Sequence, residues 1–290
     1  MSGILEENIK VVVRIRPINQ EEEDRGETSC VRSAGDGDNE VQIRMSSYDA
    51  HTYRCNKCFA PNTSQKAFFN DSGLTNLLDS AIGGYRACAF AFGQTGAGKT
   101  YSILGPSSSV SENTGILNQS LFYLFSKLDR LNVKYTLRLS CMEIYKEQVY
   151  DLLVDGEDRK LPLQVREHNR DGFFLENCTM LPCGNADEAC AFLDRAMMYR
   201  RIGSHDMNSR SNRSHCLTDI FIELPGQAAL QSIVDAANAQ GKEQDFPGLE
   251  GLQSEMENDR EYTVMGRITL VDLVSRHTLS IIPSGMVHLL

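Results

Sequence analysis

The sequence predicts a large α/β domain, and three observations support this prediction. Its 290 residues exceed a minimal module and suit one large domain. Apolar, strand-like runs alternate along the chain with segments whose apolar residues recur at helical spacing. Hydrophobic residues make up 41% of the chain and charged residues 23%, which is ordinary for a folded protein and excludes wholesale disorder or a fibrous repeat.

Five segments have the composition of strands. The first, Ile9 to Ile15, is rich in β-branched residues and is stopped by Pro17. The others are Ala87 to Phe92, Tyr135 to Cys141, Leu217 to Leu224 and Arg267 to Leu273. The polar, acidic residues 19–40 between the first strand and the following hairpin region are expected to form a long surface connection.

Three segments are predicted helices. Asn70 to Ile82 carries an apolar face and is closed by two glycines, and residues 116–131 repeat leucine at helical spacing. Residues 186–201 form the third, with Asn185 as its N-cap. The acidic stretch 226–261 between the last two strands is expected to be a flexible loop insert.

Charge, the N-terminal sequence and cysteine content bear on the partners and the cell compartment of the chain. The net charge of −10 argues against broad nucleic-acid binding. The N-terminus is acidic and lacks a secretory signal, and no apolar run reaches the roughly 20 residues of a membrane helix, so we expect no membrane association. Nine cysteines without an export signal indicate reduced thiols. These features favour a cytoplasmic protein.

The most informative motif is a glycine-rich loop that directly follows the strand ending at Phe92. It has a glycine, four free positions and then Gly-Lys-Thr, the pattern of a phosphate loop, and comprises Gly93, Gln94, Thr95, Gly96, Ala97, Gly98, Lys99 and Thr100. The glycines let backbone N–H groups converge on phosphate oxygens, the lysine reaches the β and γ phosphates, and the threonine hydroxyl can complete a magnesium shell. A chance glycine turn would give this pattern in about one chain in a hundred of this length. The loop therefore predicts a nucleotide site.

Several further segments, in order along the chain, resemble the kinesin motor domain. Arg14-Ile15-Arg16-Pro17 resembles the Arg-x-Arg-Pro element of that family, and Asn208 to His215 resembles switch I. The remaining matches are Tyr53 to Gln65, Gly84 to Thr100, Glu143 to Tyr145, Val149 to Leu153 and, as the opening of switch II, Leu270 to Leu273. A phosphate loop alone would not name a family, and another class of phosphate-loop ATPase is the alternative if these matches are coincidental.

The resemblance implies a P-loop NTPase fold, in which helices flank a central, mostly parallel twisted sheet. It also implies an ATP-driven, magnesium-dependent motor that acts on microtubules of the cytoskeleton. Arg14, Arg16, Pro17 and Tyr101 would surround the adenine, and Asp272 with the loop threonine would serve the metal. Taken without the other segments, these residues read as strand-end charges, a turn proline and a core aromatic.

Switch I carries the residues that the family uses for hydrolysis. Short hydroxyl and amide side chains can reach a γ-phosphate, its magnesium or the attacking water. By resemblance, Ser211, Asn212, Arg213 and Ser214 are the catalytic candidates, while Asn208 contacts nucleotide and places the segment. The family usually has a second serine where this chain has Asn212.

A second metal-like signal lies near the N-terminus. Cys55 and Cys58 have the Cys-x-x-Cys spacing, with His51 four residues before the first of them. Half a zinc site is one interpretation, but no second Cys or His pair follows nearby. The family resemblance places both cysteines in a strand, so structural thiols are favoured.

The chain departs from the family after Asp272. Kinesins continue through Leu-Ala-Gly-Ser-Glu, whereas this chain reads Leu273-Val-Ser-Arg-His277, so the switch II glycine and glutamate are replaced. We expect residues 1–273 to be a partial motor domain that lacks the last helices, and 274–290 to be a divergent tail of a truncated product. Two functions follow: a microtubule motor ATPase, or a non-motile nucleotide-binding or regulatory fragment that cannot hydrolyse ATP.

Overall fold

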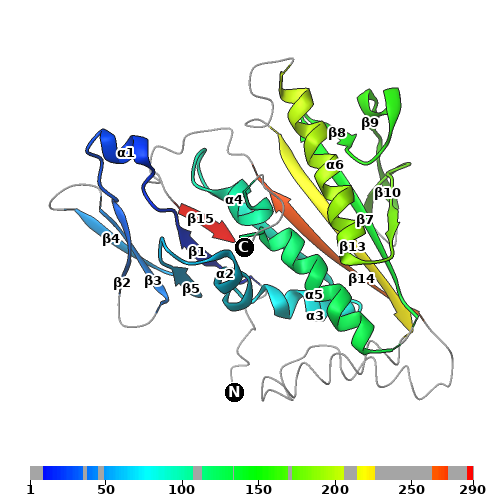
Figure 1. Cartoon of the computed structure of the whole chain (residues 1–290), viewed down its shortest axis with the longest axis horizontal. Helices are drawn as coiled ribbons and strands as arrows, with labels where there is room; N and C mark the ends of the chain where they lie inside the picture. The colour runs from blue at the N-terminus through cyan, green and yellow to red at the C-terminus, as the bar shows by residue number, and fades with distance from the viewer. Residues whose placement is uncertain are drawn as a thin grey trace. The chain divides into compact units, whose positions relative to one another are not determined.

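The computed structural model describes residues 9–34, 38–44, 49–106, 113–132, 134–168, 172–205, 214–225, 263–273 and 286–289. Figure 1 labels the helices and strands, and the residues belong to two units. The first comprises residues 1–72, 89–116 and 272–290, and the second comprises 73–88 and 117–271. The acidic insert expected at 226–261 and most of the tail expected at 274–290 lie outside the described residues.

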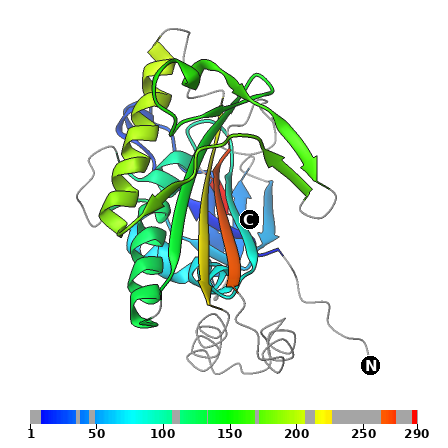
Figure 2. The same ribbon diagram turned by 90° about the vertical axis from the view of Figure 1, so that its right-hand side faces the viewer.

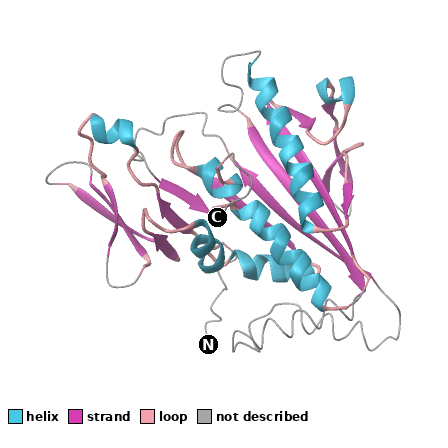
Figure 3. Ribbon diagram, in the orientation of Figure 1, coloured by secondary structure: helices cyan, strands magenta, loops and turns pink. Residues whose placement is uncertain are grey.

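The first unit contains two sheets, drawn as separate sets of strands in Figure 3. One has the order β5-β1-β15-β6, formed by β5 (Lys57–Phe59), β1 (Val12–Ile15), β15 (Met286–Leu289) and β6 (Arg86–Phe92), of which residues 86–88 belong to the second unit. The other has the order β2-β3-β4, formed by β2 (Val31–Ala34), β3 (Glu40–Arg44) and β4 (Ala50–Arg54). A buried cluster of Val13, Ile15, Val31, Val41, Ile43 and Cys58 joins β1 and β5 to β2 and β3.

Three short helices belong to the first unit: α1 (Gln20–Asp24), α2 (Gln65–Asp71) and α4 (Lys99–Leu104). Asn19 caps α1 through a capping box with Glu22, and the Ser64 hydroxyl caps α2 by accepting from the Ala67 amide at 3.1 Å. Helix α4 follows the glycine loop directly, which places the start of that helix beside the candidate phosphate site.

The second unit is built on a sheet of order β14-β13-β7-β8-β9. Its strands are β14 (Thr263–Asp272, of which Asp272 belongs to the first unit), β13 (His215–Pro225), β7 (Thr136–Tyr145), β8 (Gln148–Asp151) and β9 (Pro162–Leu163). Strand β12 (Leu181–Cys183) also pairs with β7, and β10 (Val165–His168) forms a hairpin with β11 (Gly172–Leu175). A 3₁₀ turn, η1 (Gly156–Lys160), precedes β9.

Helices of the second unit pack on one face of its sheet. They are α3 (Leu74–Ile82), α5 (Ile116–Arg130, from Leu117 onward) and α6 (Ala186–His205), and Figure 2 shows α5 and α6 on the same side of β7 and β13. The covered face includes Leu139 and Ile220, which are register partners and fully buried. In α5 the leucines 117, 121, 124 and 128 are all buried, as their helical spacing predicts.

The opposite face of the same sheet is more exposed. Phe221 is the register partner of Arg138, and both side chains are only partly buried. Arg267 lies over the Phe221 ring and donates to the Asp219 carboxylate at 2.7 Å, while Met265 is 64% exposed. This is the exposure expected of a sheet face on which none of the described helices packs.

Several predicted elements are confirmed, including the strand ending at Phe92 and the helices near 116–131 and 186–201. The Asn185 side chain accepts from the Glu188 amide at 2.8 Å, as an N-cap should. No helix in the part of the chain that the structure describes is long and apolar enough to cross a membrane.

Three expectations about local structure are wrong. The helix predicted over 70–82 is two helices, because Gly73 adopts φ +85° and interrupts α2 and α3. The connection predicted over 19–40 contains the helix α1, which a capping box stabilises, and the short strand β2. Both are short and lie within polar sequence, so they lack the apolar periodicity of longer elements. Cys55 lies in a loop and only Cys58 is in a strand, although Cys58 is buried in the apolar cluster, as expected of a structural thiol.

The strand directions also differ from the mostly parallel sheet that was expected. Strand β1 runs parallel to β5, whereas β1–β15, β13–β7, β7–β8 and β8–β9 are antiparallel. For β7 and β8 the reason is local. Their connection is only Lys146 and Glu147, both at positive φ, and a two-residue turn can join only antiparallel neighbours.

Candidate nucleotide site

The glycine loop connects the end of β6 to the first residue of α4 and curls as a phosphate loop must. Gly96 has φ +80° and Gly98 has φ +95°, values that a residue with a Cβ rarely adopts. The Ala97 amide donates to the Gln94 carbonyl at 3.2 Å, and the Ser102 amide donates to the Gly98 carbonyl at 2.9 Å. The loop therefore leads straight into the first turn of α4.

Lys99 is held inside this loop. Its side chain is only 6% exposed, and its Nζ donates to the carbonyl oxygens of Gly93 and Gln94, each at 2.7 Å. Burial lowers the pKa of Lys99, while the nearby negative charge of Asp272 opposes this shift. Among the described residues the hydrogen-bond acceptors of this ammonium are neutral carbonyls, so an anion that enters the loop can compete for it.

Thr100 and Asp272 meet at the same end of the loop. The Thr100 hydroxyl donates to Asp272 Oδ2 at 2.9 Å, although the two residues are 172 positions apart in sequence. Asp272 is 2% exposed. A hydroxyl oxygen and a carboxylate are hard oxygen donors of the kind that Mg²⁺ prefers, so this pair fits a magnesium site and could hold the ion directly or through water.

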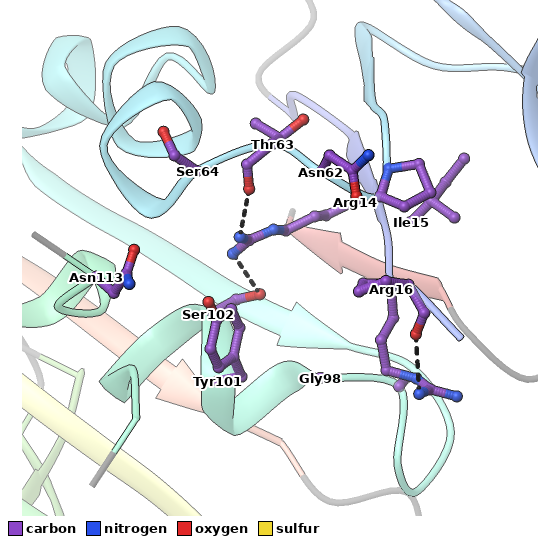
Figure 4. A pocket seen from close by; sticks show the side chains of 13 residues that line it. Arg14, Ile15, Arg16, Asn62, Thr63, Ser64, Gly98, Tyr101, Ser102 and Asn113 are labelled. Carbon is purple, nitrogen blue, oxygen red and sulfur yellow. Dashed lines mark hydrogen bonds between the residues drawn. The ribbon is translucent and has the colours of Figure 1, made fainter. Parts of the chain in front are cut away.

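A pocket of about 520 Å³ lies beside the loop (Figure 4). Ala97 and Gly98 of the loop form part of its wall. The other lining residues are Arg14, Ile15, Arg16, Pro17, Pro61, Asn62, Thr63, Ser64, Tyr101, Ser102 and Asn113. Its volume lies within the range of small-molecule sites, and its wall combines prolines and an aromatic ring with a few polar groups.

Arg14 lies in the pocket wall, with its guanidinium buried. Figure 4 shows the guanidinium reaching between Thr63 and Ser102; it donates to the Thr63 carbonyl at 3.0 Å and to the Ser102 hydroxyl at 3.2 Å. It also donates to Gln65 Oε1 at 2.6 Å and lies over the ring of Phe68, 4.6 Å from its centroid. Burial lowers the pKa of Arg14, and the electrostatic interaction with Tyr101 opposes this shift.

Arg16 and Pro17 form another part of the wall and are fixed by α1. Arg16 Nη2 donates to the Glu22 carboxylate at 2.5 Å, and Nη1 donates to the Pro17 carbonyl at 3.1 Å. The Arg16 contact lowers the pKa of Glu22, and so does the Asn19 amide, which donates to Glu22 at 2.9 Å. The capping box of α1 thus holds the Arg16 side chain in place.

The structure brings together most of the residues that the sequence predicted for the site. Arg14, Arg16, Pro17, Ala97, Gly98 and Tyr101 line one pocket, and Gly93 to Thr100 form the loop beside it, with Asp272 at its threonine. Ser214 belongs to the second unit, where it is fully buried and its carbonyl accepts from Arg200 Nη2 at 2.8 Å. Asn208, Ser211, Asn212 and Arg213 lie outside the described residues.

Sequence reasoning missed three groups that hold the Arg14 side chain, of which Thr63 and Ser102 line the pocket. The Gln65 amide, the Thr63 carbonyl and the Ser102 hydroxyl all bind the Arg14 guanidinium. The only sequence signal for the first two was the family-like run that ends at Gln65. Their roles depend on contacts across 49 to 88 positions, which no local pattern reveals.

Comparison with known proteins decides the family. The kinesin motor domain family matches residues 14–279 of the chain. The chain belongs to the kinesin motor domain family. The match extends from the start of the pocket wall, at Arg14, past Asp272, so it includes every described residue of the candidate site.

Relatives and a solved structure agree with this assignment. The chain is 31% identical to kinesin-like protein KIN-14G of Arabidopsis thaliana over 76% of this chain and 22% of that protein. It is 32% identical to kinesin-like protein KIF12 of Mus musculus, over 75% of this chain and 34% of that protein. The solved structure of a fast kinesin matches with a TM-score of 0.74 and 25% identity, over 96% of this chain and 68% of that one.

The chain is thus a kinesin motor domain with the P-loop NTPase α/β fold. It spans between about a fifth and a third of the length of the two curated relatives described above. Within the matched region, residues 274–277 read Val-Ser-Arg-His.

Proposed function

We propose that this chain binds Mg²⁺-ATP, with the phosphates in the loop of residues 93–100 and the base in the adjoining pocket. The observation that carries the proposal is the arrangement of the loop: it holds Lys99 and Thr100, Asp272 contacts Thr100, and Ala97 and Gly98 of the same loop line the pocket. A ligand with a flat ring at one end and negative charge at the other matches these two adjoining regions.

Each end of the site would use different chemistry. At the phosphate end, Lys99 would exchange the Gly93 and Gln94 carbonyls for phosphate oxygens, while loop amides donate to the same anion. Thr100 and Asp272 are the described residues that would hold magnesium, which would supply positive charge beside the phosphates. At the other end, Pro17 and Tyr101 offer surfaces against which a base can pack.

Hydrolysis requires more than binding. In phosphoryl transfer to water, catalysis consists of positioning and electrostatic stabilisation, which kinesins obtain from both switch segments. By family, Ser211, Asn212, Arg213 and Ser214 would act at the γ-phosphate. The glutamate that would pair with Arg213 is replaced by His277, and the glycine whose amide would reach the γ-phosphate is replaced by Ser275. We therefore propose that this chain binds ATP and hydrolyses it slowly.

A second candidate function is ATP-driven movement on microtubules, in the cytoplasm and on the cytoskeleton. Membership of the kinesin motor domain family favours it, and the solved relative described above is a kinesin whose ATPase and microtubule interactions were studied. The replaced residues at 274–277 argue that this chain does not turn over ATP fast enough to drive such movement. The two candidates predict different ATPase rates.

Two measurements test the proposal. Calorimetric titration with Mg²⁺-ATP should show binding with a Kd between about 1 µM and 1 mM, and absence of binding would contradict the proposed function. An ATPase assay with microtubules should show little stimulation for the wild-type chain and a higher rate for Ser275→Gly/His277→Glu. Strong stimulation of the wild type above a Lys99→Ala control would instead establish the motor ATPase.

A further inference from the structure

Gln65 is a fully buried polar residue that neither the phosphate loop nor the Arg-x-Arg-Pro element contains. It is the first residue of α2 and is 0% exposed. Its Oε1 accepts from Arg14 Nη1 at 2.6 Å, and its Nε2 donates to the Tyr101 carbonyl at 2.6 Å. One amide thus connects three elements of the first unit: β1, α2 and α4.

The chemistry of the two partners fixes the orientation of this amide. Arginine can only donate and a backbone carbonyl can only accept, so the oxygen of Gln65 must face Arg14 and its nitrogen must face Tyr101. A glutamate could accept from Arg14 but could not donate to the carbonyl, and an apolar side chain could do neither. The bond to Arg14 is buried and the bond to the Tyr101 carbonyl is partly buried, and unpaired polar groups in such surroundings are costly.

The two contacts of Gln65 belong to two different elements that line the pocket. Arg14 belongs to the β1 wall, whereas Tyr101 and Ser102 belong to α4, the helix that continues the phosphate loop. Arg14 adds its own bond to the Ser102 hydroxyl and lies 5.3 Å from the Tyr101 ring centroid. The Gln65 amide and the Arg14 guanidinium therefore tie α4 to β1 at two consecutive residues.

We propose that Gln65 is a positioning residue for nucleotide binding, which sets the base pocket at a fixed separation from the phosphate loop. This inference rests on the proposed function. A nucleotide has a fixed length between base and phosphates, so a rigid link between the pocket walls spares the ordering cost that a loose pocket would incur on binding. The contacts of Lys99 and Thr100 do not pass through Gln65, so the phosphate end is independent of it.

The test compares two anionic ligands by calorimetry, each with magnesium: ATP, which fills both ends of the site, and inorganic tripolyphosphate, which fills only the phosphate end. Gln65→Met keeps the length of the side chain and removes both bonds. We expect it to weaken ATP binding about tenfold and to leave tripolyphosphate binding within twofold of the wild type. Lys66→Met, at the exposed neighbouring position, is the matched control and should change neither affinity.

Gln65→Asn is the second variant and decides the question if Gln65→Met does not fold. It keeps the amide but is one methylene too short to reach both partners, so it should show the same selective loss for ATP. Unchanged ATP binding, or a parallel loss for both ligands, would overturn the positioning role while leaving the proposed function intact. A wild-type chain that bound neither ligand would overturn the proposed function, and this inference with it.

Discussion

Replacing Lys99 with methionine tests the phosphate site directly, because it removes the ammonium and keeps most of the apolar stem. In the structure this ammonium binds two neutral carbonyls at 2.7 Å. A charge pair with a phosphate oxygen at about 3 Å and an effective dielectric constant of about 20 contributes about 5 kcal/mol. Releasing the two carbonyls costs about 1 kcal/mol each, which leaves about 3 kcal/mol. We therefore expect Lys99→Met to weaken Mg²⁺-ATP binding about 100-fold.

Lys99→Met should weaken ATP binding without lowering the thermal stability of the chain. Burial lowers the pKa of Lys99, which means that the fold holds this charge at a cost. Thermal unfolding of Lys99→Met should therefore occur at or above the wild-type temperature, with Lys66→Met as the exposed-lysine control. Binding of Mg²⁺-ATP by Lys99→Met within threefold of the wild type, measured by calorimetry, would refute the reasoning.

Three further changes test other parts of the structure. Gly266→Ala should lower the free energy of unfolding by about 3 kcal/mol in urea titrations, because a Cβ there would overlap the Ala81 carbonyl oxygen. The control Gly26→Ala, at φ +71° with open space around it, should lower it by about 1 kcal/mol. Equal losses would contradict the close packing of α3 on β14. Asp272→Asn should reduce about tenfold the factor by which magnesium strengthens ATP binding. A calorimetric titration in which this factor was unchanged would remove Asp272 from the metal site. Burial raises the pKa of the Cys58 thiol to about 11, so between about pH 9 and 11 the unfolded chain loses a proton that the folded chain retains. The free energy of unfolding should therefore fall by up to about 1.4 kcal/mol per pH unit in this range. A Cys58→Ser variant that showed the same alkaline loss in urea titrations would contradict this assignment.

The phosphate loop could be predicted because its demands are local. The glycines, Lys99 and Thr100 are adjacent in sequence, and each serves a phosphate or its metal from a fixed place in one turn. The strand before the loop and the leucines of α5 were equally clear from apolar spacing. Asp272 was found only through the family resemblance, since its contact with Thr100 spans 172 positions.

Features that depend on tertiary contacts or on a single backbone angle could not be predicted. The division between α2 and α3 depends on the left-handed conformation of Gly73, which the apolar periodicity of the segment hides. Gln65 stood in the sequence only as the end of the family-like run from Tyr53, and its contacts with Arg14 and Tyr101 are visible only in the structure. The antiparallel strands differ from the mostly parallel sheet that the resemblance indicated, and for β7 and β8 the short turn at Lys146 and Glu147 sets their direction.

The most direct test of the nucleotide site is a crystal structure of the chain with Mg²⁺ and a non-hydrolysable ATP analogue. We expect the β and γ phosphates within the loop of residues 93–100, with Lys99 Nζ moved from the Gly93 and Gln94 carbonyls onto phosphate oxygens and the base in the pocket beside Tyr101. An analogue bound elsewhere, or a loop whose Lys99 stayed on its own carbonyls with the ligand present, would contradict the account.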